Sequence, residues 1–212
     1  MKRECKWKSR RCIDTDTIWA KIQTIAENSN GVVKTSDIEA AGISRPMLKK
    51  YVDMGKLDPV RKGLYTLTDE FTDEFALLQA QSAKIIYSYG TALFFWGMSD
   101  RTPNILDITL PRGTNISRLR RDNPNLRCHY VQTEVYDLGI TETNSPQGGM
   151  VKLYDRERCI CDVIRDKEQI ELQLFTQAIK DYFKTNPNNR KLLKYGKIFG
   201  IEDKIRTYME VL

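Results

Sequence analysis

The sequence predicts an α+β protein whose first third is a winged helix-turn-helix and whose remainder mixes strands and helices. Before residue 55, apolar residues recur at helical spacing in three segments, which short glycine-containing turns separate. A basic turn and the alternating stretch "LYTL" follow, as in a β-hairpin. Beyond residue 70, helical and strand patterns are interspersed. The 212 residues are enough for one or two domains with a hydrophobic core.

Three helices are expected in the N-terminal segment. The first, in "DTDTIWAKIQTIAEN", has Asp14 and Asp16 as candidate N-terminal caps, and Gly31 follows as its C-terminal signal. The second is the short "TSDIEAAG", which Gly42 ends. The third, "RPMLKKYVDMG", has Ser44 as its expected N-cap and tolerates a proline in its first turn. This succession is the pattern of a helix-turn-helix.

The stretch "KLDPVRKGLYTL" predicts a wing after the third helix. Leu57 lies in its first strand, "RKG" makes the turn, and "LYTL" forms the second strand. Residues 15–70 are therefore expected to form a winged DNA-binding domain. The basic N-terminal extension, residues 1–14, is either a frayed terminus or an arm that tracks phosphates or enters a minor groove.

The net charge of +6 lies entirely in the first third of the chain. Residues 1–67 contain 14 Lys and Arg against 8 Asp and Glu, whereas residues 68–212 contain 20 of each kind. This asymmetry indicates two functional units, of which the first faces a polyanion.

The third helix is the expected recognition helix. Leu48 and Val52 are four residues apart and should face the core with Tyr51 beside them, so the cations fall on the other faces. Each cation alone is equally compatible with a solvated surface, and it is the cluster that predicts DNA binding. The expected base contacts are Arg45 and Lys49, the expected phosphate contacts are Ser44 and Lys50, and the wing-tip contacts are Arg61 and Lys62.

Residues 71–212 are expected to form a second α+β domain with a helical C-terminal tail. "NILDITLPRG" alternates apolar and polar residues and predicts a strand, with Leu106, Ile108 and Leu110 on one face. "LRCHYVQTEVYDLGI" and "VKLYD" predict further strands, and "TALFFWGMSD" and "RERCICDVIRD" predict helices. The segments from "EQIELQLFTQAIKDYFKT" onward are helical in pattern.

Residue types that carry chemistry are sparse. The only histidine is His129, in a predicted strand, and a single residue separates Cys159 from Cys161, whereas zinc ligands are typically two to four residues apart. No phosphate-binding glycine loop or dinucleotide signature is present. The sequence therefore predicts no catalytic residues, no metal site and no cofactor, and the protein is expected not to be an enzyme.

Cysteine usage and hydropathy indicate the compartment. The chain has five cysteines, an odd number, and no apolar run that approaches the roughly 20 residues needed to span a bilayer. Its basic start has no apolar region behind it, unlike a secretory signal. A cytoplasmic protein with reduced thiols and no membrane partner is expected.

Three blocks of the sequence resemble the AbiEi family of antitoxins, the regulatory half of abortive-infection toxin–antitoxin pairs in phage defence. They are "GVVKTSDIEAAGISRPMLKKYVDMGKLDPVRKGLYTL", "GTALFFWGMSDRTPNILDITLPRG" and "VKLYDRERCICDVIRD", the last followed by "AIKDYF". The resemblance implies a winged helix that represses the protein's own operon. It also implies that the C-terminal domain counters a nucleotidyltransferase-type toxin, without a stable complex between the two proteins.

The expected DNA partner is a double-stranded operator. One winged helix buries limited DNA surface, so repeated half-sites are expected, bound by a dimer or by cooperative loading. The candidates for a toxin-neutralising surface are the C-terminal cations Arg112, Arg118, Arg120 and Arg121.

Two other functions fit the residues. The first is a ligand-responsive winged-helix regulator whose C-terminal domain is a sensor. A neighbouring nucleotidyltransferase-like reading frame would favour the antitoxin, and its absence would favour the sensor. The second is an enzyme such as a nuclease, but no paired carboxylates and lysine accompany "LDITLP".

Overall fold

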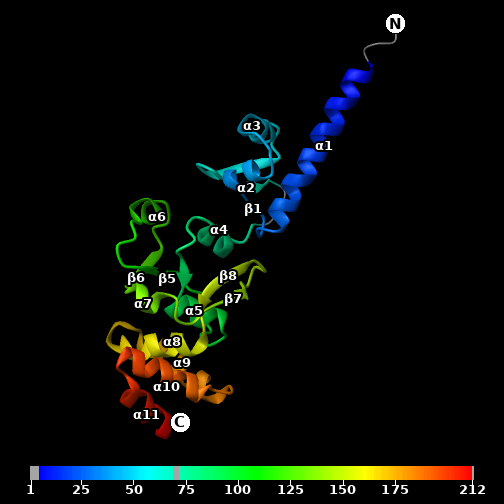
Figure 1. The fold of residues 1–212 in the computed structure, drawn as a ribbon. Helices are drawn as coiled ribbons and strands as arrows, with labels where there is room; N and C mark the ends of the chain where they lie inside the picture. Colours follow the sequence, from blue (N-terminus) through cyan, green and yellow to red (C-terminus); the bar gives the residue numbers. More distant parts are fainter. Residues whose placement is uncertain (1–4, 69–71, 212) are drawn as a thin grey trace. The chain divides into compact units, whose positions relative to one another are not determined.

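The computed structural model describes residues 5–68 and 72–211, with side chains from Thr15 onward. The chain forms two compact units, which Figure 1 shows as ribbons. The N-terminal unit extends to Gln81 and includes residues 147–149, and the C-terminal unit contains residues 82–146 and the chain from Met150 onward. Helix α4 (Glu74–Ala80) groups with the N-terminal unit, although it follows the domain limit predicted at residue 70.

The N-terminal unit has the helix–strand–helix–helix–hairpin order of a winged helix, which confirms the predicted fold. The hairpin strands pair antiparallel, and the second of them also pairs with the strand that follows the first helix, so the sheet order is β1-β3-β2. The elements are α1 (Cys5–Glu27), β1 (Val32–Lys34), α2 (Thr35–Ala40), α3 (Arg45–Asp53), β2 (Leu57–Arg61) and β3 (Leu64–Leu67).

One hydrophobic core holds these elements together. Leu48 and Tyr51 of α3 are buried in it and Val52 is half-buried, as their spacing predicted. The Tyr51 hydroxyl donates a 2.7 Å hydrogen bond to the carbonyl of Thr15, which ties α3 to α1. Each fully buried apolar side chain contributes about 1.5–3 kcal/mol. The other buried members are Ile22, Ala26, Val33, Ile38, Ile43, Leu57 and Leu67.

The first helix begins earlier than its predicted caps. Helix α1 starts at Cys5, so Asp14 and Asp16 lie inside it rather than at its N-terminus. The reason is that "CKWKSRRCID" contains no glycine or proline, and its lysines and arginines favour a helix. Of the predicted basic extension, Lys2 and Arg3 lie outside the described residues. None of the helices in the described ranges has the length and apolarity required to cross a membrane.

Asp73 caps α4 and also holds Gly149 against it. Its Oδ1 accepts hydrogen bonds from the backbone N–H groups of Phe75 (2.8 Å) and Ala76 (3.1 Å), and its Oδ2 accepts from the N–H of Gly149 (2.8 Å). A Cβ at position 149 would clash with Asp73 Oδ2, so glycine is required there.

Replacing Asp73 with alanine is expected to lower the free energy of unfolding by about 2 kcal/mol or more, measured by urea denaturation. The substitution removes an N-cap and leaves three buried donors without their acceptor. Asp73→Asn keeps one oxygen for the cap and should lose less. A loss below about 0.5 kcal/mol for Asp73→Ala, the scale of an ordinary surface substitution, would contradict this role.

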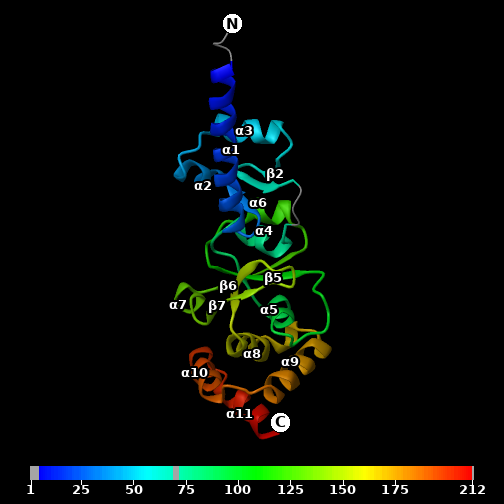
Figure 2. The ribbon, with the colours of Figure 1, turned by 90° about the vertical axis from the view of Figure 1, so that its right-hand side faces the viewer.

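The C-terminal unit is a five-stranded mixed sheet in the order β6-β5-β4-β8-β7. In Figure 2, α5 and α8 cover one face of this sheet, and α9, α10 and α11 form a further layer beyond α8. The elements are β4 (Ile86–Tyr87), α5 (Tyr89–Phe95), β5 (Leu106–Pro111), α6 (Ser117–Asp122), β6 (Leu126–Val131), α7 (Thr133–Tyr136), β7 (Ile140–Asn144), β8 (Met150–Tyr154), α8 (Arg156–Arg165), the 3-10 helix η1 (Lys167–Gln169), α9 (Leu172–Lys184), α10 (Asn189–Phe199) and α11 (Glu202–Val211).

Strand β5 lies inside the sheet, parallel to β6 and antiparallel to β4. Its predicted apolar face is buried at Ile108 and Leu110, whereas Leu106 is only partly buried. The opposite, polar face is buried as well, at Asp107 and Thr109. Burial of polar groups requires hydrogen bonds, and these residues are positioned by partners on neighbouring elements. The alternation therefore predicted the strand correctly, but it did not show that both faces are covered.

Candidate nucleic-acid interface

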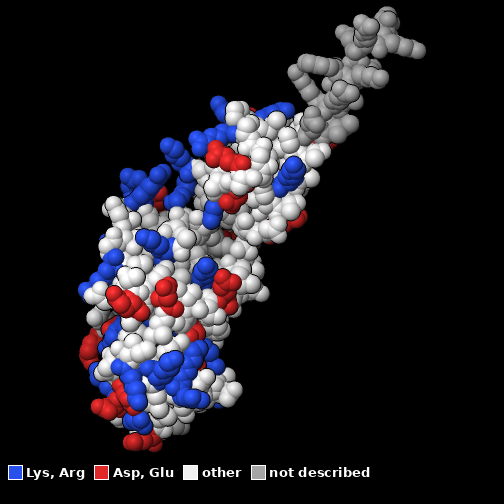
Figure 3. Space-filling model, viewed as in Figure 1, with Lys and Arg blue, Asp and Glu red and all other residues white. Residues whose placement is uncertain are grey.

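Helix α3 presents its polar residues to solvent. Ser44 is the N-cap residue, with extended backbone geometry and no capping hydrogen bond from its side chain. Arg45, Lys49 and Lys50 are exposed, and in the described part of the chain neither lysine has a hydrogen bond or ion pair. Figure 3 shows Lys and Arg side chains (blue) over the region that α3 and the hairpin occupy in Figure 1. The residues predicted from spacing thus lie on one accessible helix, opposite the core face.

Arg45 is paired within the helix-turn-helix. Its Nε donates to Oε1 of Glu39, in the last turn of α2, at 2.5 Å. This hydrogen bond, with the charge of Glu39, raises the pKa of Arg45. The side chains remain 74% and 44% exposed, so the pair lies at the surface. Sequence reasoning missed Glu39, because the two residues are six positions apart on different helices.

The wing is shorter at its tip than predicted. Strand β2 runs through Arg61, so Lys62 and Gly63 alone form the turn, with Gly63 at φ 82° in the left-handed region. The carbonyl of Gly63 accepts a 3.0 Å hydrogen bond from the N–H of Thr35, which holds the wing beside the start of α2. Lys62 is exposed at the tip.

Arg61 points to α4 rather than to solvent. Its Nη1 donates to Oε1 of Gln81, and its Nη2 donates to the carbonyl of Gln81, both at 3.0 Å. A DNA contact by Arg61 stays a prediction, and it would require both hydrogen bonds to break. In this structure Arg61 ties the wing to the C-terminal end of α4.

Lys62→Ala is expected to reduce the slope of log affinity for duplex DNA against log salt by about 0.9, the change for one lost phosphate contact. Arg61→Ala is expected to reduce it by less, because its guanidinium is already bound. Titrations at four salt concentrations measure both slopes. Equal reductions would show that Arg61 leaves Gln81 and contacts phosphate.

The cations predicted for the toxin-neutralising surface follow β5 and occupy α6. All four are exposed. Arg118 and Arg121 lie 3.9 Å and 3.5 Å from carboxylate oxygens of Asp122, which offsets part of their charge. Arg120 interacts with the thiol of Cys128 and thereby lowers its pKa, although burial outweighs this and leaves that pKa raised. Arg112 donates its backbone N–H to Val131 at the end of β6.

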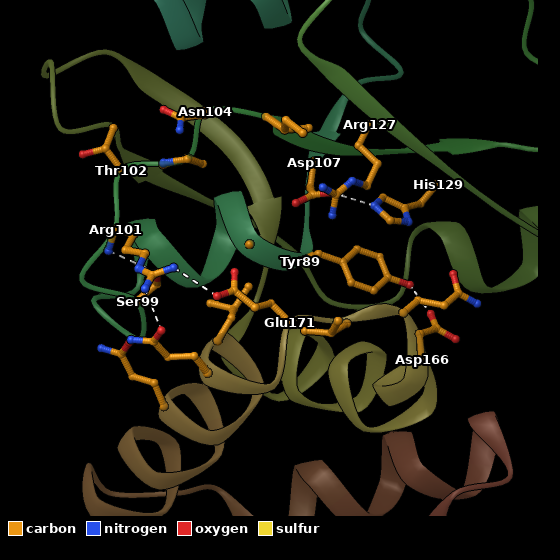
Figure 4. Close-up of a pocket in the computed structure, with 18 residues that line it drawn as sticks. Tyr89, Ser99, Arg101, Thr102, Asn104, Asp107, Arg127, His129, Asp166 and Glu171 are labelled. Carbon is orange, nitrogen blue, oxygen red and sulfur yellow. Dashed lines mark hydrogen bonds and ion pairs between the residues drawn. The ribbon is translucent and has the colours of Figure 1, made fainter.

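A polar pocket of about 560 Å³ lies within the C-terminal unit (Figure 4). The buried Asp107 forms part of its wall, and Oδ1 of Asp107 lies 2.8 Å from Nε2 of His129 and 3.6 Å from Nε of Arg127. The ring of His129 stacks on Tyr89 with centroids 3.9 Å apart. On the other side of the pocket, Arg101 donates to Oε1 of Glu171 at 3.0 Å.

Tyr89 connects this pocket to the C-terminal end of α8. Its hydroxyl donates to Oδ2 of Asp166 and accepts a 2.8 Å hydrogen bond from Arg165. Burial raises the pKa of Tyr89 and would also raise that of Asp166, but the hydrogen bonds from Arg165 and Tyr89 outweigh it and lower the pKa of Asp166. No group of three His, Cys, Asp or Glu residues within the described ranges is arranged to hold a metal ion. The sequence identified His129 but gave no signal for its partners, which come from other strands and helices.

Comparisons with known proteins agree with the N-terminal architecture. Residues 20–68, which extend from α1 to the end of the wing, match the family described as "Transcriptional regulator, AbiEi antitoxin". No curated protein matches the chain in sequence. The fold is similar to that in the crystal structure of the RV2827C protein from Mycobacterium tuberculosis, with a TM-score of 0.56 and 14% sequence identity over 83% of this chain and 69% of that chain. Residues 20–68 are therefore an N-terminal domain of the AbiEi antitoxin family of transcriptional regulators.

Proposed function

We propose that the protein is a DNA-binding antitoxin that represses its own operon and counters a nucleotidyltransferase-type toxin. The observation that carries the proposal is the winged helix matched by the AbiEi family. Lysines on the exposed face of α3 and at the wing tip have no ion pair with any residue that the structure describes. Such a surface suits a polyanion of regular shape, which is duplex DNA.

In the proposed complex, α3 lies in the major groove. Arg45 and Lys49, on the first two turns of the helix, contact base edges, while Ser44 and Lys50 contact phosphates. Lys62 reaches the backbone or the adjacent minor groove from the wing tip. Because one such domain buries little DNA, the operator contains repeated half-sites.

The C-terminal unit carries the antitoxin activity in this proposal. The exposed cations on and before α6 provide a basic surface for it, and neutralisation needs no stable complex with the toxin. A bacterial cytoplasm, where the operon, the toxin and any infecting phage meet, is the proposed setting.

A reporter assay and a rescue assay test the two halves of the proposal. Expression of the full chain should repress a reporter driven by the protein's own upstream region. It should also restore growth to cells that express the toxin encoded beside it. An unrepressed reporter would remove the repressor role, and unrestored growth would remove the antitoxin role.

The pocket favours a second candidate function, a winged-helix regulator that senses a small polar ligand. Its volume is in the range of ligand sites, and it combines a buried carboxylate, Asp107, with Arg127 and His129. The test is repression of the same reporter in cells that lack the neighbouring toxin gene, grown on different carbon and nitrogen sources. Derepression that depends on the medium and disappears in Asp107→Asn would support the sensor, and constant repression would exclude it.

A further inference from the structure

Among the residues that the structure describes, Arg45 is bound through one edge of its guanidinium. The hydrogen bond to Glu39 engages Nε, and in the described part of the chain Nη1 and Nη2 have no hydrogen bond. An arginine carries five N–H donors in a planar fork, and guanine O6 and N7 are read by two of them at once. The edge that can read a guanine is therefore unoccupied while the opposite edge is held.

The elements around the pair fix its geometry. Glu39 is in the last turn of α2 and Arg45 is the first residue of α3, and the turn between them is closed by backbone hydrogen bonds, including Ile43 N–H to Ile38 carbonyl at 3.0 Å. Gly42, at φ 76°, permits this turn. The carboxylate thus stands on a rigid support beside the N-terminus of the recognition helix.

The charge of Glu39 has a second consequence. Beside Arg45 it offsets one positive charge on the surface that faces DNA, and it repels phosphates that approach without a base contact. A paired arginine therefore adds less to the affinity for arbitrary DNA, while its free edge still distinguishes guanine from other bases.

We infer that Glu39 is a positioning residue for base readout, which holds Arg45 by Nε so that its free edge meets a guanine and which limits binding to other sequences. This inference rests on the proposed DNA-binding function. It makes the α2–α3 pair, rather than Arg45 alone, the unit that sets sequence preference at one base pair of each half-site.

Two substitutions separate the hydrogen bond by which Glu39 positions Arg45 from the negative charge of Glu39. Glu39→Gln keeps an oxygen that can accept from Arg45 Nε but removes the charge, whereas Glu39→Ala removes both. Both keep a good helix former at an exposed position, so the fold should be retained, as equal melting temperatures would verify. The full-length proteins are incubated with a pool of duplexes randomised over twenty base pairs, and the bound fraction is sequenced. Affinity for a fixed arbitrary duplex is then titrated against salt.

In Glu39→Ala, the preference for guanine at one position should fall by about 5- to 150-fold, the range for one bidentate base contact. In Glu39→Gln most of that preference should remain. The salt slope on the arbitrary duplex should steepen by about 0.9 in both variants, since both remove the negative charge that offsets the charge of Arg45.

Asp53→Ala is the matched control. It removes a carboxylate from the other end of α3, where no ion pair with a described residue exists, and it should leave the base preference unchanged. In an Arg45→Ala background, Glu39→Ala should cause no further loss of preference. Unchanged preference in Glu39→Ala, or a further loss in that background, would overturn the positioning role. Absence of any sequence preference in the wild-type protein would instead overturn the proposed function itself.

Discussion

Replacing Lys49, Lys50 and Lys62 together with alanine is expected to reduce the salt slope of binding to an arbitrary duplex by about 2.7, because each lysine neutralises one phosphate where Lys49 has no base contact to make. If the variant and the wild type bind equally at 1 M salt, this difference in slope makes the variant's affinity roughly 500-fold lower than that of the wild type at 0.1 M salt. The loss should be larger on the operator, because Lys49 is also proposed to contact a base edge there. The three side chains are exposed and unpaired in the described structure, so the fold should be unaffected.

Triple replacement of Arg118, Arg120 and Arg121 on α6 provides the matched control, because it removes the same charge from the C-terminal unit. This variant should bind the operator as the wild type does and should lose the ability to restore growth in the presence of the toxin. The lysine variant should show the reverse pattern. An equal loss of DNA binding in both variants would mean that binding depends on overall charge and not on the winged helix.

Arg158→Ala is expected to destabilise the C-terminal unit by about 3–5 kcal/mol, the cost of removing one member of a buried ion pair. Asp162 keeps a second cation, because Nη1 of Arg165 lies 2.9 Å from its Oδ1. Arg158 is fully buried, and its Nε donates to Oδ2 of Asp162 at 2.9 Å. Its Nη1 donates to the carbonyls of Val135 (2.7 Å) and Leu138 (3.0 Å). The substitution therefore also leaves these two carbonyls, at α7 and just after it, without this hydrogen-bond donor. Urea denaturation measures the loss.

The stability deficit of Arg158→Ala should shrink as the pH falls. Burial raises the pKa of Asp162 above its ordinary value of 3.8, and the charges of Arg158 and Arg165 partly oppose that rise. Without Arg158 the pKa rises further, so the folded state retains a proton that the unfolded state has released. The variant therefore loses stability as the pH rises from about 3.8, the ordinary pKa of an aspartate, to the raised pKa of Asp162 in the folded variant. The difference in the free energy of unfolding between wild type and variant should be smaller at pH 4.5 than at pH 7.5.

Arg206→Ala is the control for this prediction. Arg206 also pairs with a carboxylate one helical turn away, at 2.6 Å from Glu202, but it is half exposed. Exposed pairs of this kind contribute little, so a change of about 0.5 kcal/mol or less is expected. If Arg158→Ala were as mild as Arg206→Ala, the buried pair would not stabilise the unit.

The sequence predicted those elements that depend on local rules. Helix α3 lies where Ser44, the proline that follows and the spacing of Leu48 placed it. Helix α8 begins after Asp155, whose Oδ1 accepts from the N–H of Arg158 at 2.8 Å, as expected of an N-cap. Helix α3 has a periodic apolar face and α8 has a capping aspartate, and in each case this local signal agrees with the limits that the structure has.

Short elements were harder to predict. Helix α7 lies in "LRCHYVQTEVYDLGI", for which only strands were expected. Strand β7 begins at the last residue of that stretch and continues through residues 141–144, for which no strand was predicted. Strand β7 contains "ITETN", which has no clear apolar face, and its place is set by antiparallel pairing with β8, as at Thr141 and Leu153. The pairing that sets the position of β7 leaves no pattern of apolar residues in the strand itself.

In the candidate sites, too, features that depend on one helix were predicted, and features that depend on the packing of several elements were not. Periodicity placed Lys49 and Lys50 on the exposed face of α3 correctly, because their positions depend on one helix. The partners of Arg45 and Arg61, which are Glu39 and Gln81, depend on how separate elements pack, and charge patterns could not supply them. The buried cluster around Asp107 and the pocket beside it likewise join residues from several strands and helices.

The measurement that tests the central proposal most directly is a binding titration of the full chain on its own upstream DNA. The competitor is a scrambled duplex of the same length and composition, and both are measured at 50 mM and 200 mM salt. Binding to the upstream duplex should be at least about 10³-fold tighter, and both affinities should fall steeply with salt. Equal affinity for the two duplexes at both salt concentrations would contradict operator recognition by the winged helix.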